Sequence, residues 1–465
     1  MRKTIVLGAG ISGLSAAWQI GLLKEYEVAV YEKKERIGGL CGFYNFNGLK
    51  LDYGPHKIYS VLPGIMETFK EVGGDKLNEK KKKQKIVVRQ KFLDYPIRFG
   101  QVLSIFTFAE IIEASLSVLK TLITPYSPSK VISYEDYCIH IFGKKIYDMV
   151  FRPLAEKTWG NPKTLSAEIA RRRIPAKNIC DLLSRLLKIK KESRFTNAEN
   201  ILYPYEGFYE ICNCIAGRIE DLGFTVYVGR KPIGFDMQDN KVKAVIFDDS
   251  TKQECDLIVS SIALQELIML LFPHDKSIAE QANSFRMRHS IIAYLLIDRP
   301  KVIEDHWIFC ADKSLIFSRI SEQKLLSDFC FPRDKTIICC DFTSGEEDTI
   351  WKMADKSIIE LCVAGLEELK LIKKEEVIDS RVVKIPNFYP CYDLDFEEKR
   401  NFLIDKINHI ENVICIGRLG LADYCNTDHC LDMAIFIARA LNSGEKPPLI
   451  NYGLIERAEC YRIVD

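Results

Sequence analysis

The sequence has almost no net charge and no long uncharged apolar run. Its 65 basic and 64 acidic residues give a formal charge of +1 over 465 residues, whereas a nucleic-acid-binding protein is expected to carry a strong basic excess. The best candidate for a membrane span, residues 105–123, contains Glu110, Glu113 and Lys120. That pattern predicts an amphipathic helix. We therefore expect a small-molecule substrate, no nucleic acid and no transmembrane segment.

The cysteines lack the spacing typical of metal sites. Sixteen are present without a CxxC pair, and most fall in apolar runs such as TIICC and VICIG, where a free thiol packs as a small hydrophobic side chain. The apolar stretch after Arg2 and Lys3 is interrupted by three glycines, which argues against a secretory signal. We expect a reduced, cytoplasmic protein without a metal site. The oligomeric state is unknown.

Two basic stretches stand out from this balanced composition: EKKKKQK at residues 79–85, and LLSRLLKIKKESR at residues 182–194. Each is most simply a solvated face. Because basic amphipathic segments also bind anionic surfaces, peripheral contact with a membrane stays open.

Apolar periodicity predicts an α/β protein with a Rossmann-like domain. Residues 3–8 and 27–32 have the composition of buried parallel strands, joined by a helix over 12–23. Helical periodicity dominates residues 100–220, including the segment from Asn197 to Gly223. Further strands are predicted at 224–229, 241–249, 255–263, 290–298, 336–342 and 412–417, and further helices near 350–370 and over 427–441.

The first strand ends in the most specific motif of the chain, with glycines at positions 8, 10 and 13. In a GxGxxG turn the first glycine permits the tight turn, the second lets the backbone approach a pyrophosphate, and the third lets helix and strand pack closely. Glu32 closes the second strand, where a carboxylate can accept hydrogen bonds from a ribose. Strand, glycines, helix, strand and acid in this order predict dinucleotide binding.

A second glycine pair, Gly38 and Gly39, follows closely after Glu32. A nicotinamide enzyme does not need the backbone to return to the phosphates at this point, whereas a longer, buried flavin cofactor does. An ordinary surface turn stays open as the alternative explanation of this pair.

Several motifs follow one another in a diagnostic order. They are VLGAGISGLSAAW, YEKKERIGG, LDYGPHKIY, FRPLAEKTWG (151–160), ARRRIPAKN, NFYPCYDLDF (387–396) and ICIGRLGLADYCNTDHCLDMA (414–434). Together they resemble the large FAD family that includes amine oxidases, protoporphyrinogen oxidases, carotenoid desaturases and UDP-galactopyranose mutases. The resemblance covers nearly the whole chain, with residues 215–380 as its variable part.

The resemblance implies a discontinuous FAD-binding domain and an inserted mixed α+β substrate-binding domain. The first would comprise residues 1–78, 200–265 and 386–465, and the second residues 79–199 and 266–385. The implied cofactor contacts are Gly8, Gly10, Ile11, Ser12, Gly13, Glu32, Lys33, Arg36, Gly38, Gly39, Leu40, Gly54, Pro55, His56, Gly417, Arg418, Asn426, Thr427 and Asp428. One departure is Pro232, which stands where members of the family usually have Val and offers no N–H to the adenine.

Asn426, Thr427 and Asp428 lie at the start of the helix predicted over 427–441. Its free N–H groups would face the part of the flavin that is anionic when reduced, which a helix N-terminus stabilises.

The resemblance also implies a set of substrate-binding residues: Trp159, Arg173, Lys177, Arg319, Tyr389, Tyr392 and Asp393. Arg and Lys in a closed cleft recognise phosphate or carboxylate, so an anionic or glycosidic substrate is expected. The candidate catalytic residues are His56, Arg319 and Tyr389. Each candidate also has a non-functional explanation that stays open. The cationic residues could be surface charges, the aromatic residues could be part of the core, and His56 could make a structural hydrogen bond.

Two functions fit these residues. One is an oxidoreductase in which a small-molecule substrate loses a hydride to flavin N5. The other is a mutase-like isomerase in which reduced FAD acts as a covalent nucleophile on a nucleotide sugar. Lys177 replaces the Arg with which mutases hold the diphosphate, and NTDHCLDMA is closer to the protoporphyrinogen-oxidase-like group. Because Lys lacks the bidentate fork of Arg, we favour the oxidoreductase.

Overall fold

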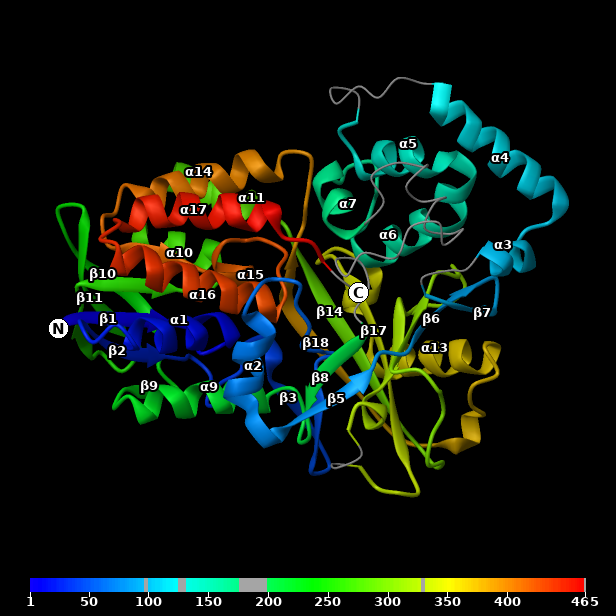
Figure 1. The fold of residues 1–465 in the computed structure, drawn as a ribbon, viewed down its shortest axis with the longest axis horizontal. Coiled ribbons are helices and arrows are strands. Elements are labelled where there is room, and N and C mark those ends of the chain that lie inside the picture. The colour runs from blue at the N-terminus through cyan, green and yellow to red at the C-terminus, as the bar shows by residue number, and fades with distance from the viewer. Residues whose placement is uncertain (96–98, 124–130, 175–198, 328–330, 464–465) are drawn as a thin grey trace.

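The computed structural model describes residues 1–95, 99–123, 131–174, 199–327 and 331–463. Figure 1 shows a Rossmann-like part at the left, a group of helices at the upper right, and a large sheet below that group. The residues after α17 (Pro447–Cys460) run toward the middle of the molecule, where these parts meet.

The Rossmann-like part is built on a parallel sheet in the order β19-β13-β1-β2-β9. These strands are β1 (Arg2–Leu7), β2 (Tyr26–Tyr31), β9 (Thr225–Tyr227), β13 (Leu257–Ser260) and β19 (Val413–Cys415). The last four residues of β1 and all of β13 are buried, as expected for central strands of a parallel sheet covered on both faces. The Rossmann-like fold predicted from the sequence is confirmed.

Helices enclose this sheet. They are α1 (Ile11–Gly21), α2 (Ile65–Gly73), α9 (Glu210–Asp221), α10 (Leu264–Leu271), α11 (Lys276–Ser284), α14 (Phe396–Asn408), α15 (Gly417–Gly420), α16 (Thr427–Asn442) and α17. Helix α1 packs against α9 and α16, and α10 and α11 pack against α14. The predicted domain boundary at residue 266 therefore falls inside a helix that contacts the Rossmann-like part. The division into domains stays a prediction.

The second large element is a mixed sheet in the order β18-β14-β17-β16-β15-β6-β7. Its strands are β6 (Gln84–Val88), β7 (Lys91–Asp94), β14 (Met287–Ile297), β15 (Trp307–Cys310), β16 (Arg319–Glu322), β17 (Thr336–Ser344) and β18 (Val377–Pro390). Helix α13 (Asp355–Glu368) packs against β14 and β18. The single helix predicted near 350–370 is in fact two, because a short α12 (Thr349–Lys352) precedes α13.

Smaller sheets complete the β-structure. They are β10 (Pro232–Gln238), β11 (Lys241–Phe247) and β12 (Lys252–Glu254); the hairpin β3 (Phe43–Phe46) and β4 (Leu49–Asp52); and the pair β5 (Leu77–Lys81) and β8 (Asn200–Pro204). The helical pattern predicted across residues 197–223 is wrong at its start. Residues 201–204 are all buried and pair with β5, so tertiary pairing overrides the local periodicity.

The remaining helices form the group at the upper right of Figure 1. They are α3 (Phe99–Ile105), α4 (Phe108–Ile123), α5 (Tyr134–Ile146), α6 (Arg152–Thr158) and α7 (Ala167–Arg173). The carboxylates of helix α4 form surface ion pairs: Glu110 accepts from Arg89 at 2.8 Å and Glu113 from Lys145 at 2.6 Å. Most large apolar side chains of this helix are exposed, namely Phe108, Ile112, Leu116, Leu119, Leu122 and Ile123. Within the described residues, none of the helices has the length and apolarity to cross a membrane.

Candidate functional site

A cavity of about 390 Å³ opens at the carboxyl edge of the parallel sheet. Residues that follow β1, β2 and β13 line it on one side, and residues of β18 and of the first turn of α16 line it on the other. Ligands of open α/β sheets bind outside the carboxyl ends of the strands. The fold therefore places the cavity where a nucleotide-binding site is expected.

The absence of a side chain at Gly8, Gly10 and Gly13 has a different structural reason at each position. Gly8 has φ of +95°, a conformation that disfavours other residues. A Cβ on Gly13 would lie 1.9 Å from the Gly8 carbonyl oxygen, so close helix–strand packing requires glycine there. Gly10 has an ordinary φ of −78° and room for a Cβ, whose nearest protein atom would be 3.8 Å away. Because Gly10 faces the cavity, only a group outside the protein explains its missing side chain.

Glu32 lies at the mouth of this turn and is buried. Its Oε2 accepts the Ala9 N–H at 2.9 Å, and its Oε1 accepts the Lys34 N–H at 3.0 Å. The carboxylate therefore orders the glycine turn as well as lining the cavity.

The second glycine pair lies directly against the first turn. Gly38 donates its N–H to the Ala9 carbonyl at 2.8 Å, and a Cβ on Gly39 would lie 3.1 Å from the Gly10 Cα. Both have positive φ and both line the cavity with Leu40. The pair is thus part of the site and not a surface turn. Arg36 stacks on the Phe43 ring instead of lining the cavity.

His56 follows the turn after β4 and lines the cavity. Its Nδ1 is 3.1 Å from the Gly54 carbonyl oxygen, and its ring stacks on Phe208. A carbonyl only accepts, so the proton sits on Nδ1 and Nε2 is left as an acceptor. Burial, with the charges of Arg418 and Arg319, lowers the pKa of His56 to about 3. The ring is therefore neutral at physiological pH.

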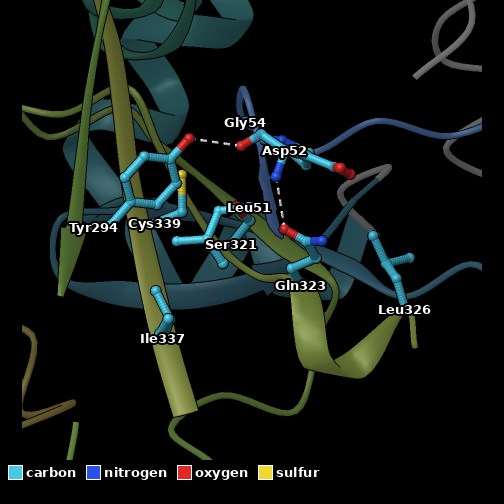
Figure 2. Close-up of a pocket in the computed structure, with 10 residues that line it drawn as sticks. Leu51, Asp52, Gly54, Tyr294, Ser321, Gln323, Leu326, Ile337 and Cys339 are labelled. Atoms are coloured by element: carbon cyan, nitrogen blue, oxygen red, sulfur yellow. Dashed lines mark hydrogen bonds between the residues drawn. The ribbon is translucent and has the colours of Figure 1, made fainter. Parts of the chain in front are cut away.

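Asp52, the last residue of β4, precedes the turn that carries His56 and is held by several hydrogen bonds. Its side chain accepts the Tyr203 hydroxyl at 2.6 Å and the Phe208 N–H at 3.0 Å. Tyr294 and Gln323 hold its backbone at 2.7 Å and 2.9 Å, beside a small cavity of about 10 Å³ (Figure 2). Burial raises the pKa of Asp52 to about 7. The hydrogen bonds join β4, β8 and β14 beneath the site.

Tyr389, Tyr424 and Arg418 form an aromatic and cationic wall of the same cavity. The Arg418 guanidinium lies 4.8 Å from the Tyr389 ring centre and 5.1 Å from that of Tyr424. It donates from Nε and Nη2 to the Cys425 carbonyl at 3.0 and 2.8 Å. Trp159 packs edge-on against both tyrosines. Arg173 stacks on Trp159 behind this wall.

The first turn of α16 also faces the cavity through Asn426, Thr427 and Asp428. Asn426 and His429 form a capping box, in which the Asn426 N–H donates to His429 Nδ1 at 3.1 Å. Asp428 accepts the Ser60 hydroxyl at 2.8 Å. The cap fixes the helix N-terminus against the cavity.

The cavity collects most of the predicted cofactor residues: Gly8, Gly10, Ile11, Ser12, Glu32, Lys33, Gly38, Gly39, Leu40, Pro55, His56, Arg418, Asn426, Thr427 and Asp428. Gly13 and Gly417 lie behind it as packing positions, since a Cβ on Gly417 would lie 2.1 Å from the Ser12 hydroxyl oxygen. Gly54 has positive φ and lines the small cavity of Figure 2.

The predicted substrate residues divide into two groups. Arg319 and Tyr389 line the cavity, and Arg319 forms an ion pair with Asp341 at 2.9 Å. Tyr392 and Asp393 do not line it: the Tyr392 hydroxyl donates to buried Asp423 at 2.8 Å, and Asp393 accepts from Arg286 at 2.8 Å. The sequence motif places these two near the site without fixing their direction. Lys177 and the basic segment 182–194 lie outside the described residues.

Sequence reasoning missed several lining residues: Ser261, Ile262, Ala263, Trp307, Tyr424 and Arg462. The first three end the strand predicted at 255–263, so their place at the carboxyl edge could have been inferred. Nothing local to Trp307 or Arg462 indicates the cavity.

The comparisons with known proteins agree with this geometry. The profile of a family described as "NAD(P)-binding Rossmann-like domain" matches residues 6–72. A 1-hydroxycarotenoid 3,4-desaturase of Flavobacterium sp. (strain P99-3) is 34% identical over 75 residues, 16% of this chain and 15% of that protein. A 4,4'-diaponeurosporene oxygenase of Staphylococcus aureus (strain USA300) is 20% identical over 70% of each chain.

Solved structures match over nearly the whole length. Reduced UDP-galactopyranose mutase gives a TM-score of 0.83 at 17% identity, covering 100% of both chains. A putative protoporphyrinogen oxidase from Exiguobacterium sp. 255-15 gives 0.74 at 14% identity, covering 96% of this chain and 99% of the other. Putrescine oxidase bound to putrescine gives 0.66 at 14% identity, over 95% and 99%. The resemblance inferred from the sequence motifs is thus confirmed at the level of the fold.

Proposed function

We propose that the chain is an FAD-dependent oxidoreductase that takes a hydride from an anionic or neutral small molecule. The main support for this proposal is that a single cavity is lined by the glycine turns (Gly8, Gly10, Gly38 and Gly39) and by the aromatic wall of Tyr389 and Arg418. At one end, Gly10 leaves its space to an external group and suits the pyrophosphate of FAD. At the other, the aromatic rings and the Arg418 guanidinium can orient a second molecule.

FAD, when bound, supplies a two-electron acceptor at its isoalloxazine ring. The chain's own residues supply position and charge. Arg418 is half-buried against tyrosine rings and donates to a carbonyl, and no carboxylate ion pair with it is found among the described residues. Its charge therefore favours an electron-rich or anionic group in the cavity. His56 stays neutral and presents Nε2 as an acceptor, so its role in this proposal is to orient a donor and not to supply a proton.

The same charge distribution weighs against a polyamine substrate. Arg418 and Arg319 lower the pKa of His56, and they would repel an ammonium group in the same way. We therefore place the substrate among anionic or neutral molecules.

A nucleotide-sugar isomerase is the second candidate, and the TM-score of 0.83 to UDP-galactopyranose mutase supports it. Two features weigh against it. Asp341 already holds Arg319, with Nε–Oδ2 at 2.9 Å and Nη2–Oδ1 at 2.9 Å, which leaves less of the fork for a diphosphate. Lys177 is also a point charge where a bidentate Arg would be expected.

The test compares the two redox states of the flavin-loaded protein. An oxidoreductase bleaches anaerobically when its substrate is added in the oxidised state, and its colour returns with oxygen or another acceptor. A mutase acts only after chemical reduction, and converts UDP-galactopyranose to its ring isomer without consuming reductant. We expect no isomer formation by the dithionite-reduced protein. Efficient isomer formation, followed by chromatography, would overturn the proposal in favour of the second candidate.

A further inference from the structure

Two cysteine thiols face each other in the cavity wall and have no part in the function proposed above. Cys425 precedes the cap of α16, and Cys430 lies in the first turn of that helix. Their sulfur atoms are 3.7 Å apart, both side chains are buried, and both line the cavity. A disulfide requires a sulfur–sulfur distance of about 2.05 Å. The pair is therefore a reduced dithiol whose two sulfur atoms already lie in contact.

The surroundings make the two sulfurs unequal. Cys430 shares a thiol–thiol hydrogen bond with Cys425, interacts with Ser12 and lies near the Arg418 charge, and these contacts outweigh burial and lower the pKa of its thiol. The hydrogen bond to Cys430 and burial both raise the pKa of Cys425. The N-terminus of α16 favours a thiolate in the same direction. Cys430 is thus the nucleophile of the pair, and Cys425 keeps its proton.

Other described cysteines lack this combination. Cys339 and Cys340 are adjacent but lie buried in β17, away from the cavity, and burial raises the pKa of both thiols. Cys41 lines the cavity, but a hydrogen bond with Cys212 and burial raise its pKa. Cys460 is exposed.

We propose that Cys425 and Cys430 form a peroxide-reactive site, in which Cys430 is oxidised first and Cys425 then closes a disulfide across the first turn of α16. The Cys430 thiolate attacks one oxygen of hydrogen peroxide, the O–O bond breaks, and hydroxide leaves and takes up a proton. The Cys425 sulfur then attacks the sulfenic sulfur, and the S–O bond breaks as water leaves. The two thiols lose two electrons and two protons, and one peroxide becomes two molecules of water.

The cavity gives the site its selectivity. Both sulfurs are buried from the outer surface, so a small oxidant reaches them through the cavity while a protein thiol does not. The disulfide would tie residue 425 to residue 430 and so clamp the turn Asn426–Asp428. The site goes beyond the proposed function, although the two sulfurs line the same cavity that we assign to FAD.

The experiment treats the purified full chain with hydrogen peroxide, stops the reaction with catalase, and alkylates the unfolded protein without reduction. Trypsin releases residues 419–439 as one peptide that contains both sulfurs. We expect this peptide to lose both alkyl tags and the mass of two hydrogens, roughly tenfold or more faster than Cys460 is oxidised. Cys339 and Cys340 serve as buried controls and should remain alkylated.

Two variants assign the roles. In Cys425→Ser, Cys430 should accumulate as a sulfenic acid that dimedone traps, whereas in Cys430→Ser neither dimedone nor a disulfide should appear at Cys425. The wild-type measurement needs no variant, so a variant that fails to fold leaves the test intact. If the peptide keeps both tags until Cys460 is oxidised, or if dimedone labels Cys425 instead, the proposal is wrong. Since only thiols are measured, either result is separate from failure of the flavin assay.

Discussion

Gly10 decides whether the first turn holds a cofactor. Its backbone is ordinary and a Cβ would fit within the protein, so we expect Gly10→Val to fold with a melting temperature close to the wild type. The valine side chain would instead occupy the pyrophosphate space, and FAD binding should be lost. Flavin absorbance after reconstitution and desalting measures this.

Gly13→Ala is the matched control. Its Cβ would lie 1.9 Å from the Gly8 carbonyl oxygen, so this change should lower the melting temperature of the cofactor-free chain. A Gly10→Val protein that retains bound FAD would contradict the proposal that the first glycine turn binds the pyrophosphate.

His56 is expected to remain neutral throughout the physiological range. Its pKa of about 3, caused by burial and then by Arg418 and Arg319, lies below the unfolded value of about 6.5. The unfolded chain therefore binds more protons between these pH values, and the His56 contribution to stability rises with pH from about 3 to 6.5. NMR titration of labelled imidazoles, with His56→Gln to assign the signal, should show no His56 transition above pH 5. A transition near pH 6.5 would restore His56 as a proton donor.

Residues differ in how far their role can be predicted from sequence. The reasons for Gly8 and Gly13 are local to one turn, so the motif spacing was enough. Tyr392 and Asp393 belong to a recognisable motif, but their directions depend on Asp423 and Arg286, which are distant in the chain. The Cys425 and Cys430 contact arises only because a helix begins between the two residues.

Helix α4 is the element that leaves most of its large apolar side chains exposed. Leu116 lies on its exposed apolar face, at 61% exposure. We expect Leu116→Lys to change the free energy of unfolding by less than about 0.5 kcal/mol, as for other surface substitutions. Urea denaturation followed by circular dichroism measures it.

Ala114 provides the contrast on the same helix, because its side chain is buried. Ala114→Lys should destabilise the chain by about 2 kcal/mol or more, since a charge would replace a packed methyl group. A large loss in Leu116→Lys would show that the apolar face packs against protein.

Long elements with one consistent period could be predicted, and short ones with distant partners could not. The predicted helix at 427–441 agrees with α16 to within a residue, because a capping residue and regular apolar spacing mark it. The local periodicity predicts a helix over β8, whereas its pairing with β5, which lies far away in the sequence, makes it a strand. Pairing of this kind leaves no local signal.

At the scale of the whole molecule, the site depends on how two sheets meet. The glycine turn belongs to the parallel sheet, whereas Tyr389 and Arg319 come from β18 and β16 of the mixed sheet. The carboxyl edge of the first sheet was predictable from the order of strands and glycines. The second wall was known only through the family resemblance, since no physical rule in the sequence brings β18 to that edge.

Asp52 links the small sheets β3-β4 and β5-β8 to the mixed sheet and should govern part of the pH dependence of stability. Its carboxyl group joins Tyr203 of β8 to the Phe208 backbone, and Tyr294 of β14 donates to its carbonyl. Burial raises its pKa to about 7, above the unfolded value of about 3.9. The folded chain thus binds more protons between these values. The Asp52 contribution is full below about pH 4 and is lost as the pH rises to about 7.

Asp52→Asn removes this titration while keeping an acceptor for the Phe208 N–H and a donor for the Tyr203 oxygen. We expect the variant to gain stability relative to the wild type as the pH rises from 4 to 8, by up to about 4 kcal/mol. Denaturant unfolding at each pH measures the difference, and Asp239→Asn, at an exposed position, should show none. A different result would contradict this prediction: the wild type becomes more stable relative to Asp52→Asn as the pH rises. In that case the two hydrogen bonds outweigh burial, and Asp52 is ionised in the folded chain.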